Sequence, residues 1–79
     1  MAANARVNSI MRDPLLVHAE LKRRGSNFSV IARTVSTRSR VISPQHVRMV
    51  VYGISSTHRE LVLREVEAVL RQGRAEQRG

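Results

Sequence analysis

The sequence combines a short length with a strong positive charge: 79 residues carry 14 Lys and Arg against 6 Asp and Glu, and the formal net charge is +8. We expect one small domain, for which dimerisation is a natural source of additional stability. The chain has no Cys, which excludes disulfides and thiolate metal sites, and no apolar run approaches the roughly 20 residues that span a bilayer. These features predict a cytoplasmic protein that neither crosses a membrane nor is secreted.

The two ends of the chain lack the hydrophobic pattern of a folded segment. Residues 1–12 are polar and unpatterned, and residues 74–79 are charged and end in Gly. We therefore expect a flexible N-terminal arm over residues 1–12, one folded domain over residues 13–73 and a flexible tail over residues 74–79.

The first helix is predicted to begin at Asp13-Pro14, because Asp is a good N-cap and Pro is tolerated in the first turn. Basic residues 22–24 suit the negative end of the helix dipole, and Gly25 suits the helix end. The expected apolar stripe consists of Leu15, Leu16, Ala19 and Leu21.

A short second helix follows, capped by Ser26 or Asn27. Its apolar residues have the spacing of one buried helix face and are Phe28, Ile31, Ala32 and Val35. Residues 36–42 have no helical period and predict a loop, although residues 40–42 can pair briefly as a strand.

Ser43 and Pro44 repeat the cap and first-turn signals for a third helix, which is predicted to end at Gly53. Its inward face is expected to hold Val47, Val50 and Val51.

A fourth helix is predicted after a capping box from Thr57 to Glu60. Its apolar band contains Leu61, Val62, Val66, Val69 and Leu70, and its acid-to-base pairs at i, i+4 are Glu60–Arg64 and Glu67–Arg71.

The positive charge is concentrated in the middle of the chain. No Asp or Glu lies between Leu21 and Arg59, whereas this stretch holds eight basic residues, namely Lys22, Arg23, Arg24, Arg33, Arg38, Arg40, Arg48 and Arg59. Segregation of one sign indicates a partner of the other sign, and a nucleic acid is the first candidate. Only Phe28 and Tyr52 are aromatic, which disfavours recognition of single strands by base stacking.

Together, the elements predict a compact all-α domain of four to five helices that contains a helix-turn-helix. In such a motif the recognition helix buries one side and presents the other to the major groove. The expected base-reading residues are Gln45 for adenine, Arg48 for guanine, Met49 for a thymine methyl group, and Pro44. The expected contacts to the DNA backbone are Asn27, Arg38, Arg40, Ser43, His46 and Tyr52.

Three segments carry a resemblance to a known family: Glu20-Leu-Lys-Arg-Arg-Gly25, Phe28-Ser-Val-Ile-Ala-Arg33 and Ile42-Ser-Pro-Gln-His-Val-Arg48, followed by Tyr52-Gly53. Over residues 13–72 the chain resembles the lambda-repressor-like helix-turn-helix family and, within it, the small Ner-like regulators of Mu-like transposable phages. The resemblance implies that Ala32 lies where the two helices cross and that Val47 and Val50 anchor the recognition helix. It also implies a phage or prophage repressor that acts in the bacterial cytoplasm.

The sequence departs from the family pattern between the second and third predicted helices. The family usually has only a few residues there, often with a Gly, whereas residues 36–42 are longer, lack Gly and contain two arginines. Either the second helix extends, or the loop bulges out and its arginines hold the DNA backbone or reach a minor groove.

A regulator of this size is expected to bind double-stranded DNA as a homodimer on an inverted repeat. Either the fourth predicted helix or an exposed part of the first can supply the dimer contact. The fourth has more apolar residues than one packing face needs, so we expect Leu63 or Val69 at the dimer interface.

Other functions are less well supported by the sequence. The chain has no paired carboxylates, no Gly-rich phosphate loop and no His or Cys pair at metal-ligand spacing, so we expect no enzyme, cofactor, metal or small-molecule ligand. The alternatives are a basic adaptor that binds an acidic host protein, and a nonspecific DNA-binding protein. Binding to a membrane surface is disfavoured because the arginines do not line one amphipathic helix.

Overall fold

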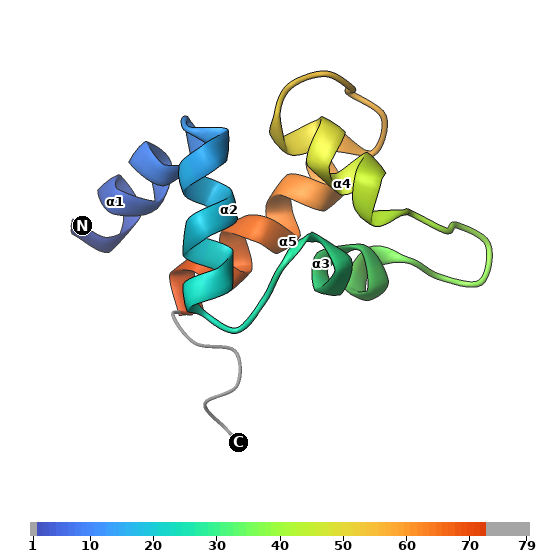
Figure 1. Ribbon diagram of the computed structural model, residues 1–79, viewed down its shortest axis with the longest axis horizontal. Helices are drawn as coiled ribbons and strands as arrows, with labels where there is room; N and C mark the ends of the chain where they lie inside the picture. The colour runs from blue at the N-terminus through green and yellow to red at the C-terminus, as the bar shows by residue number, and fades with distance from the viewer. Residues whose placement is uncertain (1, 73–79) are drawn as a thin grey trace.

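In the computed structural model, which describes residues 2–72, the chain forms five α-helices and no named strand. They are α1 (Ala2–Met11), α2 (Pro14–Arg23), α3 (Phe28–Val35), α4 (Pro44–Val51) and α5 (Arg59–Gln72). α1 and α2 lie on one side of the molecule, α3 and α4 on the other, and α5 runs between the two pairs (Figure 1). The predicted all-α fold is confirmed.

The N-terminal segment is helical, so the prediction of a flexible arm over residues 1–12 is wrong for the described part. Val7 and Ile10 of α1 are both 4% exposed, and α1 packs against α2 and α5. The two side chains lie on one helix face, one turn apart, and they extend the core beyond the predicted domain. The predicted tail over residues 74–79 lies outside the described residues.

Local capping signals correctly predict where α2, α3 and α4 begin. The Oδ1 atom of Asp13 accepts hydrogen bonds from the backbone N–H groups of Leu15 (3.1 Å) and Leu16 (3.4 Å). Asn27 accepts one from the N–H of Val30 at 2.9 Å, and Ser43 accepts one from the N–H of His46 at 3.0 Å. Each of these side chains satisfies donors that a helix start leaves without an intrahelical partner.

The packing face of α2 differs from the predicted stripe. Leu15 is 70% exposed and Leu16 38%, whereas Val17 and Leu21 are buried. The buried face instead follows the spacing 17, 20, 21, which places the carboxylate of Glu20 on the interior side of the helix. Packing against α1 and α5 determines which face of α2 is buried, and the sequence of α2 alone does not reveal that face.

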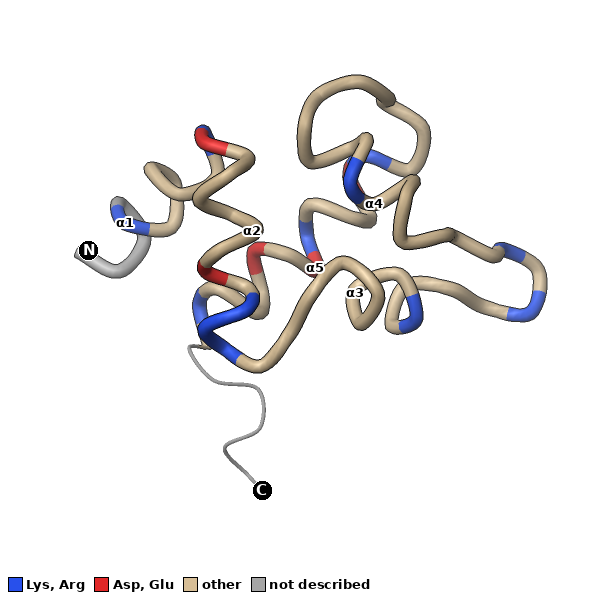
Figure 2. Tube along the Cα trace, viewed as in Figure 1, with Lys and Arg blue, Asp and Glu red and all other residues tan. Residues whose placement is uncertain are grey.

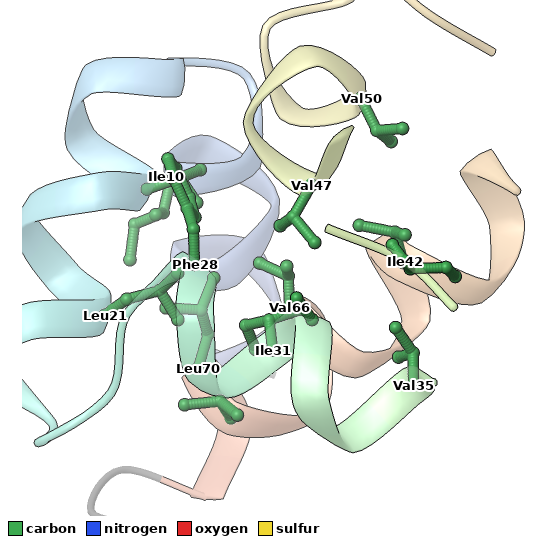
Figure 3. Close-up of a cluster of buried hydrophobic side chains, with 14 of the residues drawn as sticks. Ile10, Leu21, Phe28, Ile31, Val35, Ile42, Val47, Val50, Val66 and Leu70 are labelled. Atoms are coloured by element: carbon green, nitrogen blue, oxygen red, sulfur yellow. The ribbon is translucent and has the colours of Figure 1, made fainter. Parts of the chain in front are cut away.

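The core joins all five helices. Its buried side chains are Val7, Ile10, Val17, Leu21, Phe28, Ile31, Ala32, Val35, Ile42, Val47, Val50, Val62, Val66, Val69 and Leu70. Figure 3 shows Val47 of α4 pointing toward Ile31 of α3 and Val66 of α5. The predicted inward faces of α3 and α4 are therefore confirmed, except that Val51 is only half-buried at the edge of the core.

The end of α4 is as predicted, but the start of α5 is not. Gly53 has a φ of 78°, a left-handed conformation that ends a helix and suits Gly. α5 begins at Arg59, and the residue before it, His58, has a φ of 58°, so Thr57 does not occupy the predicted capping position. Of the two ion pairs predicted in α5, the structure forms Glu67–Arg71, at 2.9 Å between Oε2 and Nη2.

Candidate nucleic-acid interface

α3 and α4 pack directly against each other and against α5, as the two helices of a helix-turn-helix do. Val47 (0% exposed) and Val50 (2%) anchor α4 on this base. Pro44, Gln45 and Arg48 are exposed on the opposite side of α4. α4 therefore has the division between an anchored face and a free polar face that a recognition helix needs.

The residues predicted to read bases are not equally accessible. Gln45 and Arg48, one turn apart, are exposed and share a face of α4, and Pro44 is exposed at its first position. Met49 is only half-buried, which leaves a smaller part of its side chain for contact with a base. Gln45 and Arg48 are thus the residues best placed for hydrogen bonds to base edges.

Arg48 is in contact with Tyr52, the residue that caps the end of α4. Its guanidinium carbon lies 4.9 Å from the centroid of the Tyr52 ring, in a cation–π arrangement at i, i+4. Tyr52 itself is half-buried and packs against the core. The aromatic ring therefore restricts the conformations of the long Arg48 side chain before any ligand is bound.

His46 has a structural contact that the sequence did not reveal. Its Nε2 atom lies 2.7 Å from the carbonyl oxygen of Thr57, so this nitrogen carries the proton and donates to the carbonyl. The His46 and His58 rings also meet edge to face, with centroids 6.0 Å apart. These contacts tie α4 to the segment before α5, and the predicted contact of His46 with the DNA backbone stays a prediction.

The two arginines of the α3–α4 loop (residues 36–43) were predicted to act together, but they have different environments in the structure. Arg40 donates from Nη2 to the carbonyl oxygen of Val35 at 3.0 Å, whereas Arg38 is exposed. The carbonyl belongs to the last turn of α3, where backbone acceptors lack intrahelical donors. Arg40 therefore helps to end α3, and its predicted contact with the DNA backbone stays a prediction.

Two further predicted backbone contacts keep part of their polar groups available. Asn27 and Ser43 are exposed, and each uses its side-chain oxygen to cap a helix. The backbone N–H groups at the start of a helix favour anions, and in α3 and α4 these groups lie next to the two caps.

Glu20 partly neutralises the basic residues at the end of α2. The count of charges along the sequence did not reveal this pairing. Glu20 is 6% exposed, forms an ion pair with Arg24, and forms a second with Arg23 at 3.1 Å between Oε2 and Nη1. The hydrogen bond from Arg24 is the main reason that the pKa of Glu20 lies below its ordinary value of 4.5, and burial opposes it. The spacing of Glu20 from Arg23 and Arg24 was a usable signal for this cluster.

The remaining positive charge therefore lies mainly on the α3–α4 side. Figure 2 shows basic positions without acidic ones on α3, on the α3–α4 loop and on α4, whereas α2, α5 and the α1–α2 junction carry both kinds. Within residues 2–72 no helix is long and apolar enough to cross a bilayer. The same residues contain no cluster of three or more His, Cys, Asp or Glu suited to a metal ion.

The two residues predicted at a dimer interface have different environments. Val69 is 7% exposed and belongs to the core of a single chain, which corrects its assignment. Leu63 is half-buried and lines a surface hollow between α1 and α5, together with Met11 and Glu67. Of these two residues, Leu63 is the one that the fold leaves partly accessible to a second chain.

No protein-family model matches this sequence, and no match to a curated protein or to a solved structure is found.

Proposed function

We propose that this protein is a sequence-specific regulator of transcription that binds double-stranded DNA through α4. The observation that carries the proposal is the exposed face of α4, where Gln45 and Arg48 project from a capped helix that Val47 and Val50 anchor. Gln and Arg are the side chains that form bidentate pairs with adenine and guanine. The acid-free stretch from Leu21 to Arg59 supplies the electrostatic attraction to phosphate.

A single domain of this size buries little DNA surface, so we propose that two copies bind an inverted repeat with half-sites about one helical turn, roughly 34 Å, apart. Such a protein acts by occupying a promoter, which favours repression. The sequence resemblance supports a role in a phage or prophage.

The test is a mobility-shift titration on the DNA just upstream of the protein's own gene, against a scrambled fragment of equal composition, at two salt concentrations. We expect a preference for the native fragment that persists at the higher salt. Equal binding to both fragments that salt abolishes would reject operator recognition there and leave a nonspecific electrostatic binder. No binding to either fragment, with capture of an acidic protein that survives nuclease treatment, would support the adaptor instead.

Base reading is tested by two substitutions with matched controls. On an operator selected from random duplexes, Gln45→Ala and Arg48→Ala should each relax the preference at one base position, by about 1–3 kcal/mol. Gln72→Ala and Arg12→Ala remove the same side-chain types from exposed positions outside α4 and should leave the preference unchanged. Equal losses on all sequences for the two α4 variants would contradict their assignment as base readers.

A further inference from the structure

The α3–α4 loop is closed by its own hydrogen bonds. Thr37 and Arg40 exchange backbone bonds, from N–H of Thr37 to O of Arg40 at 2.7 Å and from N–H of Arg40 to O of Thr37 at 3.2 Å. At its base, the Ser36 hydroxyl accepts from the N–H of Ile42 at 2.9 Å and donates to the carbonyl of Ala32 at 2.7 Å. Ile42 is 5% exposed and anchors the loop in the core. The loop therefore has a defined shape before it meets a partner.

This closure gives the two loop arginines opposite roles. Arg40 is half-buried and its guanidinium lies against the carbonyl of Val35. Arg38 occupies the turn between the paired residues 37 and 40 and is exposed. A guanidinium has several N–H donors in a fixed planar arrangement and no acceptor, so it suits phosphate oxygens. Arg38 is thus presented outward by a turn that Arg40 helps to hold.

The surroundings of this turn are suited to an anion. The loop stands out from the body of the molecule beside α3 and α4 (Figure 1), and Figure 2 shows no acidic position on the loop, on α3 or on α4. Arg38 lies five residues before Ser43, the cap of α4, so the chain can separate the two by at most about 17 Å. The major groove is about 12 Å wide, so a helix inside it lies less than about 17 Å from the phosphates of the strand that borders the groove.

We infer that Arg38 forms a second DNA contact, with a phosphate of the strand that borders the groove occupied by α4. This inference rests on the proposed function, because it takes α4 as the element that enters the groove. The contact carries no base information, and it fixes the position of α4 along the duplex. Arg40 is a positioning residue for the turn.

The experiment measures the salt dependence of binding to one duplex for the wild type, Arg38→Gln and the charge-matched control Arg12→Gln, which changes an exposed residue at the α1–α2 junction. Each phosphate contact adds about 0.9 to the slope of log affinity against log salt. Between 50 and 200 mM salt, the wild type should therefore lose about 3.5-fold more affinity than Arg38→Gln. Arg12→Gln should follow the wild-type slope. The loss in Arg38→Gln should be equal on duplexes that differ only in the bases flanking the operator.

The outcomes separate the two proposals. A wild-type slope in Arg38→Gln would overturn the loop contact while leaving DNA binding by α4 intact. A loss confined to duplexes with A·T flanks would overturn the phosphate assignment in favour of minor-groove reading. Failure of the wild type to bind any duplex would reject the proposed function and the loop contact together.

Discussion

The guanidinium of Arg48 stacks on the ring of Tyr52, with 4.9 Å between the guanidinium carbon and the ring centroid. Arg48 is exposed on α4 and Tyr52 is the residue that caps its end, so a side chain proposed to read a base is already restricted in the free protein. Pre-ordering of this kind lowers the entropy lost on binding.

We expect Tyr52→Leu to weaken operator binding by about 2- to 5-fold, which corresponds to an exposed cation–π interaction of about 0.5–1 kcal/mol. Tyr52→Phe keeps the ring and therefore the stack, so any loss of binding in this variant measures the DNA-backbone contact expected of the Tyr52 hydroxyl. Fluorescence anisotropy on a labelled operator measures both, after circular dichroism shows that each variant is folded. Stronger binding by Tyr52→Leu would mean that the stack holds Arg48 away from its target.

Arg40 should contribute to stability, whereas Arg38 should not. Arg40→Gln removes the donors to the Val35 carbonyl and should lower the free energy of unfolding by about 1 kcal/mol. Arg38→Gln changes the same charge at an exposed position and should stay within about 0.5 kcal/mol of the wild type. Urea denaturation followed by circular dichroism makes the comparison. Equal effects of the two variants would contradict the distinction between them.

The lowered pKa of Glu20 predicts that the folded protein loses stability in acid. The pKa of this carboxyl is lowered in the folded state, chiefly by the hydrogen bond from Arg24, so between the folded and unfolded pKa values the unfolded chain binds more protons. The contribution of Glu20 is therefore complete above its ordinary pKa of 4.5 and is lost as the pH falls through the folded value. Thermal melts from pH 7 to pH 3 should show this decline.

The matched variant for this prediction is Glu20→Gln. It should be less stable than the wild type at pH 7, by about 1–3 kcal/mol, because the guanidinium of Arg24 loses its charged partner. Its stability should depend less on pH below 4.5 than that of the wild type. Parallel pH curves for the two proteins would show that another carboxyl causes the decline.

α1 should be required for stability. Ile10→Ala removes a side chain that is 4% exposed in the core, and the expected loss is about 2–5 kcal/mol. Asn8→Ala, on the exposed side of the same helix, should have little effect. Chemical denaturation distinguishes the two, and a small loss for Ile10→Ala would restore the interpretation of this segment as an arm.

Leu63 should matter for association and Val69 for folding. Leu63→Arg places a charge at a half-buried position in the hollow between α1 and α5, and should reduce the sedimenting mass from dimer to monomer in a folded protein. Val69→Ala should lower stability without changing the mass of the folded species, because Val69 is buried within one chain. An unchanged mass for Leu63→Arg would remove Leu63 from the proposed dimer interface.

The parts of the fold that depend on local chemistry could be predicted from the sequence. The caps Asp13, Asn27 and Ser43 act on N–H groups two or three residues away, so the starts of α2, α3 and α4 follow from short segments. The buried face of α3 was equally clear, because its four apolar residues leave only one helix face that they can share.

The parts that depend on distant contacts could not be predicted in this way. In α1 only Val7 and Ile10 are buried among the residues whose burial is described, too few for a recognisable period. Without α1, the sequence of α2 favoured Leu15 and Leu16, which the fold leaves exposed. In the candidate site, residue type predicted the exposed Gln45 and Arg48, but the contacts of His46 with Thr57 and of Arg40 with Val35 exist only once the loops have folded.

The packing of α1 against α5 has a consequence for synthesis on the ribosome. The two helices are the first and the last that the structure describes, yet they share one core. A nascent chain that ends before α5 therefore lacks Val62, Val66, Val69 and Leu70, and the apolar faces of α1 and α3 stay open to solvent or to a chaperone. Folding of this domain is therefore expected to be completed only after α5 has left the exit tunnel.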